Sequence, residues 1–496
     1  MVFLASLKAY IQRLNQPELQ MNVCNYPNFP NMKSTLFSRA LLLLILSGLL
    51  WSCNKDDDKD PVLDPDATLE EEINNWIYDV MDEVYYWRLN LGTPIAATSD
   101  PSDYFKSLLY VPVDRFSVIY PDYQELINSL SGISLDPGYE FKLYRDGNTD
   151  NVFAEVLYIK KNGPASSKDL KRGDAIIAIN GTKITVDNYR DLLEQAEQTH
   201  TITPFRYNPE SNSYAQMDDI SITPVQFSED PNFLDTVYTI NNQKIGYVVY
   251  NFFAPGTTAD ATKYDKEMDA VFAKLKAENI SSLVLDLRYN GGGYVTSAVN
   301  LASLIGPSVT SSDIFSKTKY NNLLASEIPA LSNVTTAFLN KAENLGNILT
   351  DNRLYVLTSS GTASASELII NGLKPYMDVF LIGDTTYGKN VGSIAIEDED
   401  NPDNNYGLLP IVTQSFNSLD QSEYSNGFAP NIEVNENTEV LVELGDINEI
   451  MLRTAIENIT GIPSSARAIK VDRIELANTL EKKIRTGKMI ESPIKK

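Results

Sequence analysis

Ser364, a serine in a turn rich in small residues, is a first candidate for chemistry in this sequence. The stretch TSSGTASASELIINGLKPY, residues 358–376, places small hydroxyl residues between an apolar run and a helical pattern. A serine in the first turn of a helix lies against amides that have no partner within the helix, and these favour a developing negative charge. Serine and threonine are also the preferred helix N-caps. The stretch alone therefore leaves two interpretations open, a nucleophile and a cap.

A serine nucleophile needs a base to remove its proton, and the composition limits which residue that could be. The chain contains one histidine, His200, which falls in a segment predicted to belong to a different domain. The pattern GxSxG is absent around Ser364, so a Ser–His–Asp triad is nearly excluded. Lys389, in TTYGKN, remains as the candidate base. Burial would have to lower its pKa from about 10.4 by roughly three units, whereas a solvated surface lysine is the alternative.

TASASE and YGK, with Ser364 and Lys389 25 positions apart, resemble the C-terminal processing (tail-specific) serine peptidases. The resemblance covers roughly residues 69–461, most of the chain. It implies a Ser–Lys dyad in which Ser364 is the nucleophile and Lys389 is the general base. It also implies a structural or supporting role for Glu367.

Two positions depart from the pattern of this family. The family usually has a glutamine four residues after the lysine, which orients the lysine, and this chain has Ser393 there. Lys389 would then be held by Ser393, by Asn390 or by neither. Downstream, NGFAPNIEV has Asn431 where the family has an acidic residue. Neither departure removes the dyad, but the first leaves open how the pKa of the lysine is tuned.

A glycine triplet follows an apolar strand pattern in SLVLDLRYNGGG, residues 282–293. Glycine amides at such a turn can hold the anionic oxygen of an acyl-transfer intermediate, and such donors are typically worth several kcal/mol in rate. DLRYNGGG also resembles the family's DLRxNxGG, which implies an oxyanion hole made by the backbone amides of Gly292 and Ala365, with Gly293 close to them. A strand-to-helix turn also needs glycine for conformational reasons, and both roles can hold together.

The elements that must position these residues change character along the chain. Residues 69–125 show a helical pattern, and residues 126–225 show short strands separated by Gly, Pro and Asn turns. Within the latter, KNGPASSKDLKRGDAIIAINGTKI resembles the core of a PDZ domain, a fold that binds peptide C-termini by strand addition. Strands and helices alternate over residues 226–461, and residues 462–496 form a C-terminal extension. We expect a multidomain α+β protein with a small N-terminal helical domain, a PDZ-like β domain and an α/β peptidase core of the C-terminal processing peptidase type.

The first residues of the chain carry signals for export. MKSTLFSRALLLLILSGLLWSC begins at Met32 with a short basic segment and continues with an apolar run, which is typical of a secretory signal. Its end resembles a bacterial lipoprotein box, which implies that Cys53 is lipidated. We expect translation to start at Met32, residues 1–52 to hold an upstream extension and the signal peptide, and residues 53–68 to form an acidic tether. This predicts an exported lipoprotein anchored to a membrane of the cell envelope, the outer membrane, with its external or periplasmic exposure left open.

The composition excludes several classes of function. A formal net charge of −25 argues against binding to nucleic acid, which requires clustered Lys and Arg. HExxH, paired CxxC and Walker motifs are absent, so we expect neither a metal nor another cofactor. An SxxK pattern at residues 316–319 lacks a following SDN and KTG, and we interpret it as chance.

The predicted function is that of a serine endopeptidase whose protein or peptide substrates are selected through their C-terminal region by the PDZ-like domain. The alternative is a catalytically weak or inactive surface lipoprotein that binds peptides through the same domain. The sequence does not predict the oligomeric state.

Overall fold

The computed structural model describes residues 68–463, 469–471 and 473–491. Cys53, the lipoprotein signal and the acidic tether up to residue 67 lie outside the described residues. Within the described ranges, each helix is too short or too polar to cross a membrane. The same ranges hold no group of His, Cys, Asp and Glu side chains that could bind a metal ion.

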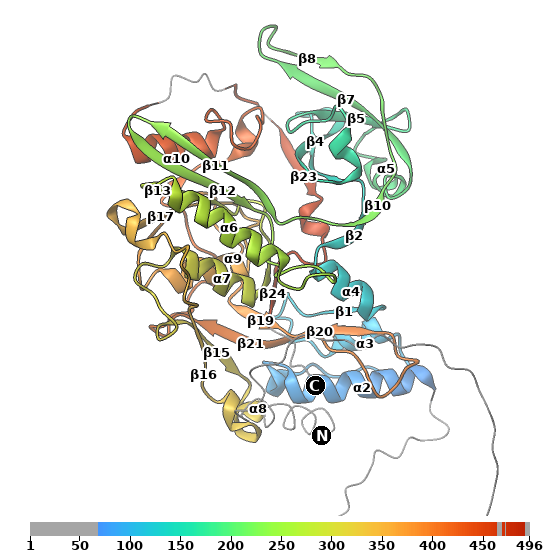
Figure 1. The fold of residues 1–496 in the computed structure, drawn as a ribbon. Helices are drawn as coiled ribbons and strands as arrows, with labels where there is room; N and C mark the ends of the chain where they lie inside the picture. The colour runs from blue at the N-terminus through green and yellow to red at the C-terminus, as the bar shows by residue number, and fades with distance from the viewer. Residues whose placement is uncertain (1–67, 464–468, 472, 492–496) are drawn as a thin grey trace, which may run out of the picture.

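An amphipathic helix, α2 (Leu69–Val84), opens the N-terminal domain. The amide of Thr68 donates to Glu71 Oε2 at 2.9 Å, and the amide of Glu71 donates to Thr68 Oγ1 at 3.3 Å, which is the reciprocal pattern of a capping box. Apolar side chains of α2 pack in one cluster with residues of the α/β core, so the helix supports the core from below in Figure 1. The remaining helices and strands of this part are α3 (Pro101–Ser107), β1 (Val118–Tyr120) and α4 (Tyr123–Leu130).

The PDZ-like domain is built on a sheet with strand order β23-β3-β4-β5-β7-β8, flanked by helix α5 (Tyr189–Gln195). Asn180 and Gly181, both with positive φ, form a tight turn between two of its strands, as expected where Asn and Gly separate short strands. The strands of this domain are β2 (Ile133–Asp136), β3 (Tyr139–Arg145), β4 (Val152–Ile159), β5 (Ala175–Ile179), β6 (Thr182–Lys183), β7 (His200–Asn208), β8 (Ser213–Gln216), β9 (Ile220–Ile222) and β10 (Val225–Ser228).

The α/β core contains a six-stranded sheet of order β11-β12-β13-β17-β18-β22 that is parallel except at its edge strand β11. Side chains of α6, α7 and α9 share one apolar cluster with this sheet, and side chains of α10 share another, so helices cover both faces as parallel sheets require. The elements are β11 (Asn232–Ile240), β12 (Gln243–Tyr250), α6 (Lys263–Ala277), β13 (Ser282–Asp286), α7 (Val295–Ile305), β17 (Arg353–Thr358), α9 (Ala365–Leu373), β18 (Asp378–Gly383), β22 (Ile432–Glu433) and α10 (Ile450–Thr460).

A second six-stranded sheet, of order β14-β24-β19-β21-β15-β16, lies beside the first (Figure 1). One of its inner strands, β24, comes from the C-terminal extension, and another strand of that extension, β23, joins the PDZ-like sheet. The strands of this sheet are β14 (Gly292–Tyr294), β15 (Ile314–Tyr320), β16 (Val334–Ala337), β19 (Val391–Ser393), β21 (Ile411–Phe416) and β24 (Lys488–Ile490). The same part of the chain contains α8 (Asn322–Glu327), β20 (Gly407–Leu409), which pairs with β1, and β23 (Ile474–Asn478).

A buried ion-pair network fixes the PDZ-like domain on the core. Arg172, from the PDZ-like domain, donates to Glu436 Oε2 at 3.0 Å, and Arg288 of the core donates to the same oxygen at 3.2 Å. Arg288 also binds Glu449 at 2.6 and 2.9 Å. Burial would raise the pKa of Glu436, but the two arginines and Lys142 hold it below its ordinary value. Removing one partner of such a buried pair typically costs about 3–5 kcal/mol, because the remaining charge is left buried without compensation, so each domain depends on the other to balance these charges.

Candidate active site

Ser364 occupies the turn between strand β17 and helix α9, as its N-cap residue. Its backbone has φ 64° and ψ −113°, a conformation that costs a residue other than glycine on the order of 1–3 kcal/mol. Such strain concentrates at active sites, where the surrounding structure holds it in place. The side chain is fully buried, and within the described part of the chain Ser364 Oγ has no hydrogen-bond partner. The turn therefore presents a hydroxyl group that is left available for a base or a ligand.

Lys389 follows strand β18 and lies fully buried. Its Nζ donates to the backbone oxygen of Gly487 at 2.7 Å and lies 5.1 Å from the centre of the Phe116 ring. Burial lowers the pKa of Lys389 well below its ordinary value, and the neighbouring ammonium of Lys488 lowers it further. A neutral amine, the form that can accept a proton, is therefore favoured at a lower pH than for an exposed lysine.

Glu367, in the first turn of α9, connects the serine to the lysine. One carboxylate oxygen accepts from the amides of Ser364 and Lys389, both at 2.8 Å. The other accepts from the amide of Gly388 at 2.7 Å and the hydroxyl of Thr386 at 2.6 Å. Burial raises the pKa of Glu367, and these hydrogen bonds oppose the rise. The carboxylate thus fixes the nucleophile turn and the lysine loop relative to each other, which makes Glu367 a positioning residue.

If Ser364 and Lys389 form a catalytic dyad, Glu367→Gln is expected to lower kcat by about a hundredfold and to leave KM within about threefold. The amide has one acceptor oxygen in place of two, so its NH2 group would face backbone N–H donors, a loss of roughly 2–3 kcal/mol. Steady-state kinetics gives kcat and KM of the variant, and thermal melting gives its stability. Glu433→Gln, at an exposed glutamate, is the matched control. A variant that melts lower but keeps the wild-type kcat would contradict a positioning role.

Gly292 and Ala365, the predicted oxyanion donors, flank Ser364. A Cβ atom on Gly292 would lie 2.7 Å from Ser364 Cβ, so only glycine permits this close approach. Ala365 is the first residue of α9, where amides have no acceptor within the helix. The Gly292 amide donates to Asn290 Oδ1 at 2.9 Å, so Asn290 must release it before it can hold an oxyanion. Gly293 packs against Phe253, whose backbone oxygen would be 2.1 Å from an added Cβ.

Of the three alternatives for what holds Lys389, Ser393, Asn390 or neither, the structure shows the third. Asn390 Nδ2 donates to the backbone oxygen of Ser422 at 2.7 Å. Ser393 Oγ is buried and has no hydrogen-bond partner within the described residues. The partner of Lys389 Nζ is instead Gly487, 98 positions further along the chain, which sequence reasoning missed. A lone glycine in a segment without a motif gave no signal that could have identified it.

His200, the one histidine of the sequence, is bound by partners within the PDZ-like domain. The residue lies in β7 of the PDZ-like sheet. Its Nδ1 lies 2.8 Å from the backbone oxygen of Gln198, and its Nε2 lies 3.3 Å from the hydroxyl of Tyr139. Burial lowers its pKa. The imidazole is thus bound within its own domain and does not serve Ser364.

Lys488 provides a test of how the pKa of Lys389 is set. The charged groups that act on Lys389 are Lys488, which lowers its pKa, and Asp114 and Glu367, which raise it. A lysine acts as a general base only when it is neutral, so an activity that depends on Lys389 as base is present above the pKa of this lysine and lost as the pH falls through it. Lys488→Met removes the repelling ammonium, and we expect the rising limb of kcat/KM against pH to move to higher pH. The exposed residue change Lys482→Met should leave the limb in place, and an unmoved limb in Lys488→Met would refute the explanation.

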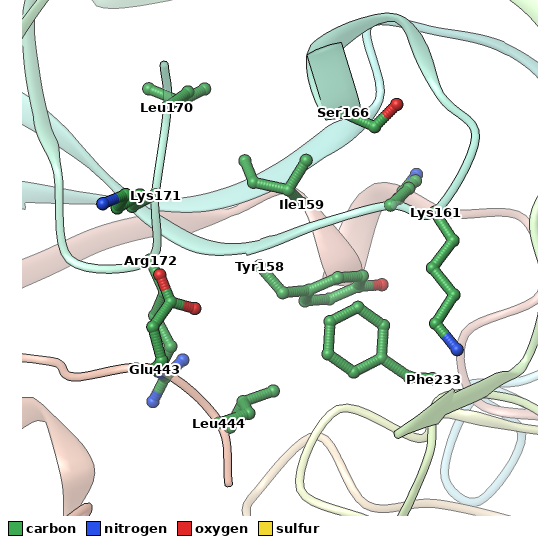
Figure 2. Close-up of a pocket in the computed structure, with 11 residues that line it drawn as sticks. Tyr158, Ile159, Lys161, Ser166, Leu170, Lys171, Arg172, Phe233, Glu443 and Leu444 are labelled. Carbon is green, nitrogen blue, oxygen red and sulfur yellow. The ribbon is translucent and has the colours of Figure 1, made fainter. Parts of the chain in front are cut away.

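A cavity of about 320 Å³ lies apart from these residues, between the PDZ-like domain and the core (Figure 2). Tyr158 and Arg172 line it from the PDZ-like domain, and Phe233, Glu443 and Leu444 line it from the core. Neither the serine nor the lysine of the candidate dyad contributes to its wall. The cavity is therefore a feature of the domain boundary rather than the place where a scissile bond would be bound.

Three segments of the chain match models of known protein families. Residues 244–434 match peptidase family S41, residues 72–118 match the peptidase S41 N-terminal domain, and residues 155–203 match the PDZ domain. The crystal structure of a Bacteroides fragilis NCTC 9343 protein assigned as an S41 protease superposes with a TM-score of 0.66 at 25% identity. That match covers 78% of this chain and 98% of the other.

Curated relatives are processing peptidases of low sequence identity. The chain is 26% identical over 272 residues to the chloroplastic C-terminal processing peptidase of Tetradesmus obliquus, which covers 53% of this chain and 52% of that protein. It is 24% identical over 312 residues to carboxy-terminal processing protease CtpB of Bacillus subtilis (strain 168), which covers 61% and 57%. The chain thus spans little more than half the length of these relatives. Together with the matched domains, the structure confirms the predicted fold class of N-terminal domain, PDZ domain and α/β peptidase core.

Proposed function

We propose that this chain, which has the N-terminal, PDZ and peptidase domains of peptidase family S41, is a serine endopeptidase with Ser364 as nucleophile and Lys389 as general base. The observation that carries the proposal is the Glu367 carboxylate, which accepts from the backbone amides of both residues at 2.8 Å. The burial of Lys389 supports the same assignment, because it lowers the pKa of a lysine that must be neutral to act.

In the first half of the reaction, Ser364 Oγ attacks the carbonyl carbon of a peptide bond while Lys389 Nζ accepts its proton. The two atoms must first come within about 2.6–3.2 Å, because Lys389 Nζ is bound to Gly487 in this structure. The carbonyl oxygen becomes an oxyanion that the amides of Ala365 and Gly292 are placed to bind, once Asn290 has released the latter.

In the second half, the tetrahedral intermediate collapses and the carbon–nitrogen bond breaks. Lys389 returns the proton to the leaving amine, and the acyl group remains as an ester on Ser364. Water then attacks this ester while Lys389 again accepts a proton. The bond between the acyl carbon and Ser364 Oγ breaks, Lys389 returns the proton to Ser364 Oγ, and the new carboxyl terminus is released. Burial of the site strengthens each of these charge interactions, because water no longer screens them.

A covalent serine probe provides the test of this proposal. A fluorophosphonate should react with the wild-type protein, peptide mapping should place the adduct on Ser364, and cleavage of an unfolded protein substrate should stop in proportion to labelling. Proteolysis that continues after complete labelling of Ser364 would disprove the assignment. Cleavage and labelling that are both absent would favour the peptide-binding lipoprotein without activity.

Substrate selection and location complete the proposal. The PDZ domain supports selection of protein substrates through their C-terminal region, as strand addition to this fold would allow. The signal that ends at Cys53 supports an exported lipoprotein anchored at the outer membrane. Mass spectrometry of the mature N-terminal peptide should find acylated Cys53, and an unmodified N-terminus upstream of it would contradict the anchor.

A further inference from the structure

The C-terminal segment, residues 473–491, runs from the PDZ domain to the active site. Its first strand, β23, pairs with β3 of the PDZ sheet in antiparallel register. Its second strand, β24, is inserted between β14, which carries Gly292, and β19, which begins two residues after Lys389. Figure 1 shows the two strands as separate pieces, one in the PDZ sheet and the other near β19. The segment thus touches the two places that an extended substrate would have to reach.

At the PDZ end, the C-terminal segment occupies the edge of strand β3. The amide of Thr479 donates to the backbone oxygen of Phe141 at 3.1 Å, and the amide of Phe141 donates to Thr479 Oγ1 at 3.0 Å. Leu476 and Ala477 pack against the apolar cluster of the PDZ domain, which includes Leu192 of α5. PDZ domains take peptides by adding a strand to such an edge. Here the chain's own segment has that position.

Between the two strands lies a buried acidic cluster formed by Asp136, Glu140 and Glu229. Within this cluster, Lys160 Nζ lies 2.5 Å from Asp136, 2.5 Å from Glu140 and 3.5 Å from Glu229. Three carboxylates and one ammonium leave a net charge of −2. Buried charges without partners are strongly destabilising, so the cluster calls for two further positive charges.

The C-terminal segment supplies these two charges. Lys483 Nζ lies 2.6 Å from Asp136 and 3.0 Å from Glu140, and Arg485 binds Glu229. Burial would raise the pKa of Asp136, but Lys160 and Lys483 together hold it below its ordinary value. The acidic cluster is therefore a built receptor for a basic, extended polypeptide.

At the active-site end, the segment binds to the catalytic groups. Gly487 accepts from Lys389 Nζ at 2.7 Å, and its own amide donates to the backbone oxygen of Gly291 at 2.7 Å. A Cβ atom added to Gly292 would lie 2.6 Å from the Lys488 backbone oxygen and 2.7 Å from Ser364 Cβ. A carbonyl of the segment therefore lies beside the nucleophile, where a substrate peptide would have to be placed.

We propose that the C-terminal segment is a tethered, displaceable occupant of this chain's own substrate path, and that the path binds an extended polypeptide with basic residues. The inference rests on the proposed function for its active-site end. While the segment is docked, Lys389 is bound to Gly487 instead of Ser364, and strand β3 has no free edge. A substrate gains access by replacing the segment at all three places, so the docked segment holds the peptidase off.

The first test measures docking without any peptidase activity, in a Ser364→Ala background. Lys483→Glu with Arg485→Glu turns two attractions to the acidic cluster into repulsions. We expect amide hydrogen exchange in β24 to rise at least tenfold, and the matched change Lys482→Glu at an exposed neighbour to leave it unchanged. Equal exchange in the two variants would overturn the proposal, provided that thermal melting shows both to be folded.

The second test measures access to Ser364. In the protein with an intact Ser364, the double variant should react with a fluorophosphonate about tenfold faster than the wild type, and the free peptide IELANTLEKKIRTGKMIE, residues 474–491, should reverse this gain. Faster exchange without faster labelling would overturn the blocking role. Hydrogen exchange is measured without catalysis, so the two proposals can fail separately. If β24 is released but Ser364 reacts in neither the wild type nor the variant, the proposed function is disproved, while displacement of the C-terminal segment is established. If the double variant fails to fold, a chain that ends at Thr486 replaces it. The same peptide should then suppress fluorophosphonate labelling of Ser364 in that shortened chain, and labelling that is unchanged by the peptide would overturn the proposal.

Discussion

Ser364→Ala is expected to lower the rate of protein cleavage by a factor on the order of 10⁴ to 10⁶, the range seen when a nucleophilic serine is removed. The acyl-enzyme route is lost with the hydroxyl, and what remains is binding and the amides of Gly292 and Ala365. Stability should change little or rise, because the buried Ser364 Oγ has no hydrogen-bond partner within the described residues and alanine removes that cost. The strained backbone of residue 364 is retained.

This prediction is measured with soluble protein that begins at Asp66, by following digestion of an unfolded protein over hours at pH 8. Ser360, exposed in the same turn, provides the control: Ser360→Ala should digest at the wild-type rate. If Ser364→Ala digests as fast as the wild type, either a contaminant or a different nucleophile is responsible. That result would remove the basis of the proposed function.

Lys389→Met is the second change with a large expected effect, a fall in kcat of roughly 10³ to 10⁴ with a small change in KM. Methionine fills the volume of a buried lysine stem but cannot accept a proton from Ser364. The variant loses one hydrogen bond, the one that Lys389 Nζ donates to the Gly487 oxygen. The change in the free energy of unfolding is therefore expected to be small compared with the change in the activation free energy.

The pH dependence separates a base from a merely structural lysine. In the wild type, kcat/KM should rise with pH through the lowered pKa of Lys389, since the neutral amine is present above it. The residual activity of Lys389→Met should lack this rise, and the exposed residue change Lys168→Met should retain it. A variant that keeps both the wild-type rate and the rising limb would show that another group acts as the base.

The order of domains could be predicted, and the residues of the proposed dyad could be selected, because both depend on local patterns. The strand–turn–helix around Ser364 spans about twenty residues, and the DLRYNGGG turn follows directly from a buried strand. The family resemblance then connected Ser364 with Lys389. Glu367 was expected to have a supporting role, but three of its four hydrogen bonds could not be derived, because they join α9 to a loop about twenty positions away.

The contacts of the C-terminal segment could not be predicted from the sequence. Strand β24 has three residues, and a strand this short carries too little alternation to indicate a register or a partner. Gly487 meets Lys389 only because β24 is inserted between strands that are distant in sequence. The orientation of Asn390 toward Ser422 has the same origin, since it is decided by tertiary packing rather than by the residues next to it.

Because Arg172 of the PDZ domain and Arg288 of the core share the carboxylate of Glu436, the PDZ domain could not easily be exchanged for one from another protein. Domains that are exchanged among proteins usually meet at modest, rather polar interfaces. Here Arg172 crosses the boundary and binds the same oxygen as Arg288, deep inside the molecule. A foreign PDZ domain grafted onto this core would leave Glu436 short of one arginine unless it brought its own at the same place. The two domains are therefore expected to diverge as a matched pair, with changes at this boundary arising together on both sides.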